Sequence, residues 1–595
     1  MDKKLYNSRS LVRNNPQVFA AAGKCNDLSE VRVRLTELFS KMELEAAHKV
    51  EGMSISYMAR SRDCAQALRS MLKKRSDELA GFSIAQAIFD IARGVERPDL
   101  SQAFYADLYH VLDGMQGKGS SNALEDVYLS PFDHLSGREA AIARSAQLDN
   151  LRAEVDRRMA LYGNGLQLDS IERRRKRMDF IRGILGASEE EWNDWRWQVA
   201  NIVGDLPMLE RLVNLAEEER SAVAAACENS LPFGVTPYYL SLIDDENTTR
   251  DSAIRAQVLP PCDYVEQVVN TDDSSALDFM GEEDTSPFDL ITRRYPAICI
   301  LKPFNTCPQI CVYCQRNWEI DDTMAKGAFA GMDRVDEAIE WIREHPGIHE
   351  VLVTGGDPLA MGDGAIEDIL SRIAMVPTVE RIRIGTRTLV TMPMRMTDKL
   401  ADILAGYRIP GTRTVAVVTH VQHPYEITPQ LTEAVEKLRK RGIPVYNQLV
   451  YTFYASRRFE SSALRRYLRL VGIDPYYTFN TKGKDETRAY RVPIARLLQE
   501  QHEEARLLPG LERTDEAVFN VPRLGKNYLK SGAHRDLLSI LPDGSRVYEF
   551  FPWEKNISTA IKTYCTPDVP ILDYLERLDE VSENIEDYDT IWYYF

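Results

Sequence analysis

The 595-residue sequence contains no apolar run of about 18 residues, the length that a membrane-spanning helix needs. Its first residues lack the apolar core of a secretory signal peptide, so we expect a cytoplasmic protein. Basic residues are not in excess, and the formal net charge of -17 argues against a surface built mainly for nucleic acid. We therefore expect a globular protein that has neither a membrane nor a nucleic acid as its partner.

Cysteine is scarce, and its nine copies are an odd number that does not suggest a disulfide framework. We expect six of them to be structural thiols: Cys25, Cys64, Cys227, Cys262, Cys299 and Cys565. The other three stand together in Cys307-Pro-Gln-Ile-Cys311-Val-Tyr-Cys314. Thiolates this close in sequence select a soft centre such as zinc or an iron–sulfur cluster. This loop is therefore a candidate metal site.

The cysteine loop supplies three ligands, whereas a structural zinc site needs four. Three cysteines leave one iron of a [4Fe-4S] cluster open, and an open iron is what binding of S-adenosylmethionine (SAM) requires. The CxxxCxxC spacing, with Tyr313 before the last cysteine, resembles the signature of radical SAM enzymes, which cleave SAM reductively. A distorted zinc knuckle completed by a distant residue is the alternative.

The N-terminal part of the chain, residues 1–186, carries no constellation of residues with recognisable chemistry. Residues 1–186 are predicted to form a helical N-terminal region, with a break near residues 116–122. The basic run 173–177 lies on a predicted helix, where such a run usually marks a solvated face or a subunit contact. Residues 187–290 are predicted to be a helical and extended segment that precedes a barrel.

Residues 291–480 alternate short apolar runs with amphipathic helical patterns. One predicted helix begins with Thr428 as its cap and stops at Gly442. Six runs are strand-like: 298–301, 351–354, 382–385, 414–419, 445–450 and 476–480. Parallel βα units of this kind predict an α/β fold, in the form of a partial (β/α)6 barrel.

The active site of such a barrel lies at the carboxyl ends of its strands, and the cysteine loop directly follows the first strand. The same edge receives Thr354-Gly-Gly-Asp357, Gly385-Thr-Arg387, Thr419-His420, Asn447-Gln448 and Lys482. This convergence is a second argument for an enzyme. Residues 481–595 are predicted to be a small C-terminal α+β segment, with a strand pair around Leu541-Pro-Asp-Gly544 and an acidic end that docks by its aromatic residues.

Between Trp192 and Lys526 the order of motifs resembles the lysine 2,3-aminomutase family of radical SAM enzymes. The matching motifs are Trp192-Asn-Asp-Trp-Arg-Trp-Gln, Thr236-Pro-Tyr-Tyr-Leu-Ser-Leu-Ile-Asp244, Arg294-Tyr-Pro296, Thr354-Gly-Gly-Asp-Pro-Leu359, Ile384-Gly-Thr-Arg387, Thr419-His420, His423-Pro424, Glu426-Ile-Thr428, Asn447-Gln448 and Pro475-Tyr-Tyr477. The resemblance covers more than half of the chain and leaves out residues 1–186. It implies three cofactors: a [4Fe-4S] cluster on Cys307, Cys311 and Cys314, SAM, and pyridoxal 5'-phosphate (PLP).

The resemblance also implies the residues that hold SAM. Gly355 and Gly356 would let the backbone approach it closely, and Asp357 would accept hydrogen bonds from its ammonium group. His420 and Gln448 resemble further SAM contacts, and their alternative is a role as hydrogen-bonded polar groups of the core.

For PLP, Arg294 and Tyr295 resemble ligands of the phosphate, and Lys526 resembles the lysine that forms the Schiff base. The loop before that lysine departs from the family pattern, because Pro522-Arg-Leu-Gly525 has few glycines and is one residue shorter. The alternative is a surface lysine at 526, with Lys530 close enough to confuse the assignment.

Two further departures concern zinc and the substrate. The lysine enzymes carry a zinc site built from cysteines, but Arg458 stands at the corresponding place, so no zinc is predicted. Those enzymes hold the distal ammonium of lysine with two aspartates, and here the aligned residues are Lys482 and Asn520. A cation and an amide favour a distal carboxylate instead, as in the glutamate 2,3-aminomutases of the same family. Arg316 resembles the residue that binds the α-carboxylate of the substrate.

We therefore expect an isomerase that moves the amino group of glutamate from C2 to C3, through a PLP aldimine and a 5'-deoxyadenosyl radical. Its partners would be the amino acid, a reducing protein such as a flavodoxin or ferredoxin, and further copies of the chain in a homo-oligomer. Three alternatives stay open. They are the same migration on lysine or another amino acid, a radical SAM enzyme without PLP, and a non-catalytic cluster-containing assembly or sensor protein.

Overall fold

The computed structural model describes residues 5–48, 55–119, 134–245, 248–271, 277–481, 485–551 and 563–595. Within these ranges the strands form a sheet of nine and a sheet of three. No helix in the same ranges combines the length and the hydropathy that a membrane span requires.

The large sheet runs in the order β1 to β9, so each strand lies beside its neighbour in sequence. Strands β2 to β8 are parallel, and β1 and β9 add antiparallel edges. The bounds are β1 Ile291–Thr292, β2 Ile298–Phe304, β3 Glu350–Gly355, β4 Arg381–Gly385, β5 Thr414–Thr419, β6 Val445–Tyr451, β7 Ile473–Asn480, β8 Glu516–Val521 and β9 Gly525–Tyr528. The predicted α/β class and partial barrel are confirmed.

All six predicted strands are confirmed as β2 to β7, and the sheet continues beyond them. Strand β8 is a seventh parallel strand, paired with β7 in the register Tyr477 to Glu516. It was not predicted, because a single amphipathic helix does not connect it to β7. The connection instead consists of short pieces: a 3-10 segment Asp485–Tyr490, helix α24 (Ile494–Gln499), one turn of π-helix (Glu500–Glu504) and further 3-10 turns.

Helices between consecutive strands cover the outer face of the sheet. They are α18 (Met332–Arg343), α19 (Asp363–Ala374), α20 (Thr388–Thr391), α21 (Asp398–Gly406), α22 (Pro429–Lys440) and α23 (Glu460–Leu470). The predicted start of α22 is confirmed, since the Thr428 side chain accepts a hydrogen bond from the Leu431 amide at 3.1 Å. The predicted stop is confirmed as well, because Gly442 has a φ of 74° just past the helix end.

The N-terminal region is helical, as predicted. It contains α1 (Ser8–Asn14), α2 (Pro16–Gly23), α3 (Leu28–His48), α4 (Ile55–Met71), α5 (Lys74–Ala80), α6 (Ile84–Ala92), α7 (Gln102–Met115), α9 (Gly137–Met159) and α10 (Leu168–Leu185). Helix α7 ends at the start of the predicted break. In α10, part of the basic run packs within the chain: Arg174 is buried, and Arg177 donates to the Leu212 carbonyl at 2.6 Å.

The segment between this region and the barrel contains α11 (Glu189–Trp192), α12 (Trp195–Ala200), α13 (Leu206–Leu212), α14 (Glu217–Glu228), α15 (Pro237–Leu240), α16 (Thr249–Arg255) and α17 (Cys262–Val269). The C-terminal part contains α25 (Ile571–Glu580). The second sheet joins β10 (Arg535–Ile540), β11 (Arg546–Phe550) and β12 (Tyr564–Pro567). The predicted strand pair around Gly544 is confirmed as β10 and β11. The docking of the acidic end is confirmed too, since Tyr588, Trp592 and Tyr593 are buried.

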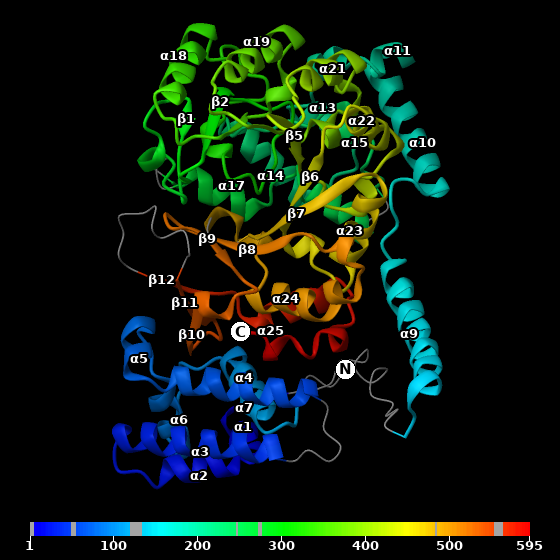
Figure 1. Cartoon of the computed structure of the whole chain (residues 1–595). Helices are drawn as coiled ribbons and strands as arrows, with labels where there is room; N and C mark the ends of the chain where they lie inside the picture. The colour runs from blue at the N-terminus through cyan, green and yellow to red at the C-terminus, as the bar shows by residue number, and fades with distance from the viewer. Residues whose placement is uncertain are drawn as a thin grey trace.

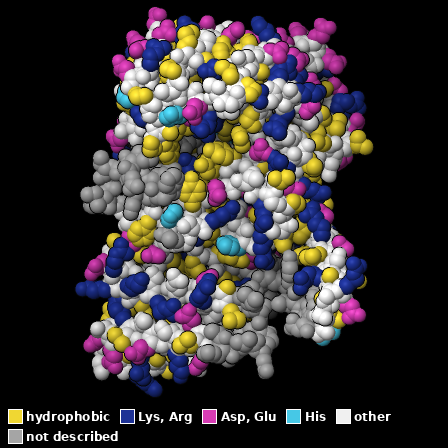
Figure 2. Space-filling view, in the orientation of Figure 1, with side chains coloured by type: hydrophobic (Ala, Val, Ile, Leu, Met, Phe, Trp, Pro, Cys, Tyr) yellow, Lys and Arg dark blue, Asp and Glu magenta, His cyan; other side chains and the backbone are white. Residues whose placement is uncertain are grey.

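Figure 1 shows how these parts are stacked: helices α1 to α7 gather at one end, and the barrel with α18 to α22 lies at the other. The C-terminal strands β10 to β12 and helices α24 and α25 lie between them, while α9 and α10 run along one flank. On the same face, Figure 2 shows charged side chains of both signs over the two ends and hydrophobic side chains gathered in a central hollow. The N-terminal helices therefore support the C-terminal sheet rather than the outer helices of the barrel.

Candidate functional site

The cysteine loop leaves the carboxyl end of β2 and is pinned to the glycine pair at the end of β3. The Gly356 amide donates to the Phe304 carbonyl at 2.8 Å, and the Asp357 amide donates to the Thr306 carbonyl at 2.9 Å. A Cβ atom on Gly356 would lie 2.0 Å from the Thr306 oxygen, and Gly355 has a φ of 111°. The two glycines are therefore required by the close approach of the cysteine loop and by backbone conformation. Their predicted contact with SAM stays a prediction.

The three thiols of the loop lie in different electrostatic surroundings. Burial raises the pKa of Cys307 well above its usual value, and the nearby Asp357 carboxylate raises it further. Burial also raises the pKa of Cys311, but the Arg387 guanidinium opposes this shift and donates to the sulfur at 2.8 Å. The Cys314 sulfur accepts a hydrogen bond from the Arg316 amide at 3.4 Å.

The three thiols belong to one loop, and the charges of Cys311 and Cys314 both act on Cys307. An iron–sulfur cluster distributes its cysteine ligands over several irons, so this loop could supply three ligands to one cluster.

Asp357 is buried, and its carboxylate accepts four hydrogen bonds. They come from the Thr386 hydroxyl at 2.6 Å and from the amides of Leu359, Arg387 and Thr388 at 3.1, 2.8 and 3.0 Å. The three bonds from Thr386, Arg387 and Thr388 tie the end of β3 to the turn after β4. Sequence reasoning missed this role, because these three partners lie about thirty positions away in the chain.

His420 directly follows β5 and Gln448 lies on β6, and both residues are half-buried. Burial and the Arg387 charge lower the pKa of the His420 imidazole to about 4, so the ring is neutral near pH 7. Its backbone carbonyl accepts a hydrogen bond from Arg387 Nε at 3.3 Å. The structure thus brings both residues to the predicted edge of the sheet, and their SAM contacts stay predictions.

A cluster of cations, called here the basic cluster, surrounds a buried carboxylate at the same edge. Arg294, Lys302 and Arg316 lie 3.6, 3.4 and 2.5 Å from Glu282. Burial alone would raise the pKa of Glu282, but the three cations together lower it. Glu319 adds a second carboxylate, 3.2 Å from Lys302. Sequence reasoning predicted Arg294 and Arg316 but missed Lys302, which lies on β2, and Glu282, which lies in the segment predicted only to be helical and extended.

Lys526 lies on β9, directly opposite Asn520 of β8. Its Nζ donates to the Tyr295 hydroxyl at 2.6 Å and sits 4.4 Å from the centre of the Tyr295 ring. Lys530, the competing candidate, instead donates to the Asp515 carbonyl at 3.2 Å. The structure therefore brings Lys526, Tyr295 and Asn520 together, whereas Lys482 lies outside the described residues.

The short loop before Lys526 is a tight β-hairpin turn. Arg523 and Gly525 have φ values of 59° and 91°, which lets the chain reverse within a few residues. Arg523 also forms a 3.0 Å ion pair with Asp284, two positions from Glu282. The loop thereby links the strand that carries Lys526 to the segment that carries the buried carboxylate of the basic cluster.

Arg458, which stands where the lysine enzymes carry a zinc-site cysteine, is buried and paired with acidic side chains. It lies 2.9 Å from Glu503 and 3.1 Å from Glu504. Arg458 is therefore part of a set of buried ion pairs and not of a metal site.

Comparison with known proteins agrees with this geometry. The model of the Radical SAM superfamily matches residues 301–455. The chain is 46% identical over 547 residues to an uncharacterized KamA family protein of Methanocaldococcus jannaschii, covering 88% of this chain and 87% of that protein. A match of this length includes part of the N-terminal helical region.

Two further relatives match a shorter part of the chain. It is 34% identical over 355 residues to a glutamate 2,3-aminomutase of Clostridioides difficile, covering 60% of this chain and 80% of that enzyme. It is 35% identical over 317 residues to an L-lysine 2,3-aminomutase of Fusobacterium nucleatum, covering 52% and 69%. The near-equal identities do not separate the two substrates.

Proposed function

The chain belongs to the KamA family of radical SAM enzymes, and from this premise we propose that it is a glutamate 2,3-aminomutase, which converts L-glutamate to β-glutamate. The observation that carries this proposal is the placement of Lys526 against Tyr295 and opposite Asn520, beside the basic cluster. Arg294, Lys302 and Arg316 outnumber the carboxylates of Glu282 and Glu319 in this part of the site. An excess of positive charge suits a phosphate and an acidic amino acid better than a second ammonium group.

Each cofactor has residues that fit it. The cluster and SAM together would supply a hydrogen-abstracting radical, and PLP would supply the π-system through which nitrogen migrates. Cys307, Cys311 and Cys314 would hold the cluster, and Lys526 would attach PLP through its amine. Arg294 is well suited to the PLP phosphate, because its guanidinium is buried and close to Tyr295 along the chain.

The remaining groups position the substrate and exclude water. Arg316 follows Cys314, the last cysteine of the loop, by two residues. It would bind the α-carboxylate of the substrate, which would replace Glu282 as the ion-pair partner of Arg316. Asn520 would donate its amide to the side-chain carboxylate, helped by Lys482. The radical has to be generated by a reducing protein that delivers one electron, and we infer that the working enzyme is a homo-oligomer.

The deciding experiment is a direct comparison of substrates. The anaerobically reconstituted enzyme, supplied with SAM, PLP and a chemical reductant, is incubated with L-glutamate or L-lysine, and β-isomers are separated by chromatography. We expect β-glutamate to form at least tenfold faster than β-lysine. Faster conversion of lysine would refute the choice of glutamate. SAM cleavage without a β-isomer of any common amino acid would refute the aminomutase itself.

A further inference from the structure

Arg387, in the turn after β4, is the strongest unexplained feature of the site. Its side chain is buried, with 8% of the residue exposed, and its guanidinium donates to the Cys311 sulfur at 2.8 Å. A buried cation is costly unless its hydrogen-bonding groups have partners. Its contact with a cysteine of the cluster loop therefore calls for a physical explanation.

Four separate parts of the chain fix the orientation of this guanidinium. It lies 2.9 Å from Glu426 in the 3-10 turn after β5, and it also donates to the Tyr239 hydroxyl at 3.3 Å. The Gln257 side-chain oxygen accepts another of its hydrogen bonds, and the His420 carbonyl accepts one from Nε at 3.3 Å. The guanidinium is held against the sulfur and cannot swing away without breaking these contacts.

The charges that act on Cys307 and Cys311 differ in sign. The Asp357 carboxylate raises the pKa of Cys307, whereas the Arg387 guanidinium lowers the pKa of Cys311. Positive charge is therefore greater at Cys311 than at Cys307. Hydrogen bonds and charge at ligand sulfurs are among the factors that set the potential of an iron–sulfur cluster.

We propose that Arg387 is a positioning residue that makes the cluster easier to reduce, by placing a fixed positive charge on the Cys311 ligand. This inference rests on the proposed function, because it requires the cluster to be bound by these cysteines. The step concerned is a one-electron reduction of the cluster from the 2+ to the 1+ state by an external one-electron donor. No bond forms or breaks in it, and no proton moves. The added electron is stabilised by the nearby cation.

Glu426 provides a second prediction, in which the reduction potential of the cluster shifts in the opposite direction. Its carboxylate lies against Arg387 and accepts a hydrogen bond from the Tyr239 hydroxyl at 2.7 Å and one from the Gln422 amide at 2.6 Å. It therefore offsets part of the positive charge that reaches Cys311. Neutralising it while keeping its shape should make the cluster easier to reduce, whereas removing the Arg387 charge should make it harder.

The test is a redox titration of the reconstituted holoenzyme, in which the reduced cluster is measured by electron paramagnetic resonance. In Arg387→Gln we expect the ratio of reduced to oxidised cluster to fall at least tenfold at a fixed potential, a shift of about 59 mV for one electron. Arg387→Lys keeps the positive charge but loses the planar guanidinium with its several hydrogen-bond donors, so the shift in potential should be smaller. In Glu426→Gln it should have the opposite sign.

Arg395→Gln is the matched control. Arg395 is fully buried in the next turn, but it donates to the Leu359 and Met361 carbonyls at 2.7 and 2.9 Å rather than to a sulfur. Its loss should lower thermal stability without moving the potential of the cluster that remains.

Iron content separates the outcomes. A normal iron content in Arg387→Gln with an unchanged potential would overturn the inference and leave the proposed function intact. An equal shift in Arg395→Gln would overturn it too, because the effect would then come from general loosening. If Cys311→Ala binds a full cluster, the proposed function itself fails. If Arg387→Gln cannot be loaded, the opposite shift in Glu426→Gln decides: a shift to easier reduction supports the proposal, and its absence refutes it.

Discussion

Two regions of this molecule are dense in charged side chains, and they are built on opposite plans. In the basic cluster, Arg294, Lys302 and Arg316 share the carboxylates of Glu282 and Glu319. In the second region, called here the buried ion-pair network, acidic side chains are in excess. Its members are Arg458, Arg465 and Arg496 together with Glu500, Glu503, Glu504 and Asp515.

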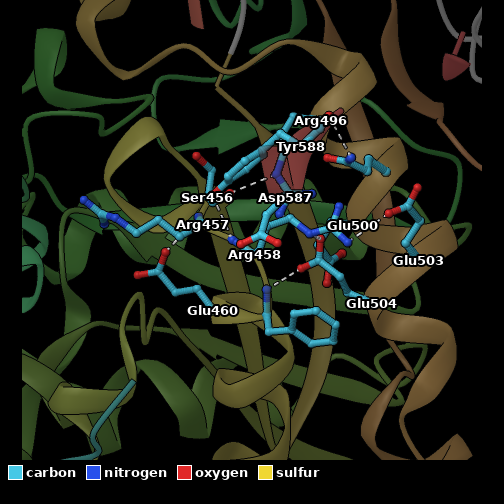
Figure 3. A network of polar contacts seen from close by, with 12 residues as sticks. Ser456, Arg457, Arg458, Glu460, Arg496, Glu500, Glu503, Glu504, Asp587 and Tyr588 are labelled. Atoms are coloured by element: carbon cyan, nitrogen blue, oxygen red, sulfur yellow. Dashed lines mark hydrogen bonds and ion pairs between the residues drawn. The ribbon is translucent and has the colours of Figure 1, made fainter. Parts of the chain in front are cut away.

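The network is closed within the chain. Arg496 lies 2.8 Å from Glu504, and Arg465 lies 2.8 Å from Asp515, all of them buried. Figure 3 shows Glu500 and Glu504 of the π-helical turn near Arg458, and Arg496 beside Tyr588 of the C-terminal segment. The Tyr588 hydroxyl accepts a hydrogen bond from the Arg458 amide at 3.0 Å. The network thereby joins the connection between β6 and α23, the segment before β8 and the C-terminal segment.

The difference between the two regions indicates two roles for a cluster of charged side chains, one structural and one in ligand binding. Where cations and carboxylates complete one another inside the core, the cluster fixes the packing of distant segments. Where positive charge is left in excess at the carboxyl ends of parallel strands, the cluster is ready for an anionic ligand. The first kind should be sensitive to mutation in stability, and the second in activity.

The largest effect is expected at the cysteine loop. Cys311→Ala should abolish reductive SAM cleavage, because the open-iron cluster loses one of its three protein ligands. The measurement is the yield of 5'-deoxyadenosine under anaerobic conditions. Cys299→Ala, a buried cysteine on β2, is the matched control and should retain cleavage.

The second-largest effect is expected in the buried ion-pair network, and it concerns stability. Arg496→Met should lower the free energy of unfolding by about 3–5 kcal/mol, because it leaves Glu504 buried without one of its partners. Denaturant titration measures this change. If stability is unchanged while SAM cleavage falls, the network is functional and the distinction drawn above is wrong.

A third prediction concerns pH. Burial raises the pKa of Glu460 to about 7 from 4.5, against the opposing charge of Arg457. Because the folded state keeps this proton while the unfolded state loses it, stability should decrease as the pH rises from 4.5 to about 7. Glu460→Gln should remove this pH dependence of stability, which amounts to at most about 3.4 kcal/mol at 1.36 kcal/mol per pKa unit.

Thermal melts of both proteins across this pH range test the prediction. Other charged groups near Glu460 include His423 at 3.5 Å, Glu583 and Arg496. Burial lowers the pKa of His423 to about 3, so it does not titrate in the same range. If the melting temperatures of the unmodified protein and of Glu460→Gln change equally with pH, Glu460 is not the group responsible for the pH dependence.

The smallest effect is expected in the basic cluster. Arg316→Gln should weaken substrate binding by roughly tenfold or more, since a hydrogen bond to a charged group contributes about 1.5–3 kcal/mol. Stability should change little, because Glu282 keeps Arg294 and Lys302 as partners. The measurement is KM for glutamate beside a denaturant titration. A loss of stability as large as that of Arg496→Met would erase the difference between the two regions.

The sequence predicted the parts of this molecule that depend on local pattern. Alternating apolar runs located six strands, and the spacing of three cysteines located the metal loop. Contacts between distant segments were not predictable in this way. Glu282 meets Arg316 only through folding, and the bond between Arg387 and Cys311 spans 76 positions. Strand β8 was missed for a related reason, because a broken helical connection hides its relation to β7.

The ion pair between Asp107 of α7 and Arg546 of β11 joins residues 439 positions apart, and both are buried. During synthesis α7 therefore leaves the ribosome 439 residues before Arg546 does. Asp107 cannot form this ion pair until β11 has been made, so α7 and β11 can pack together only after the whole barrel between them has been synthesised.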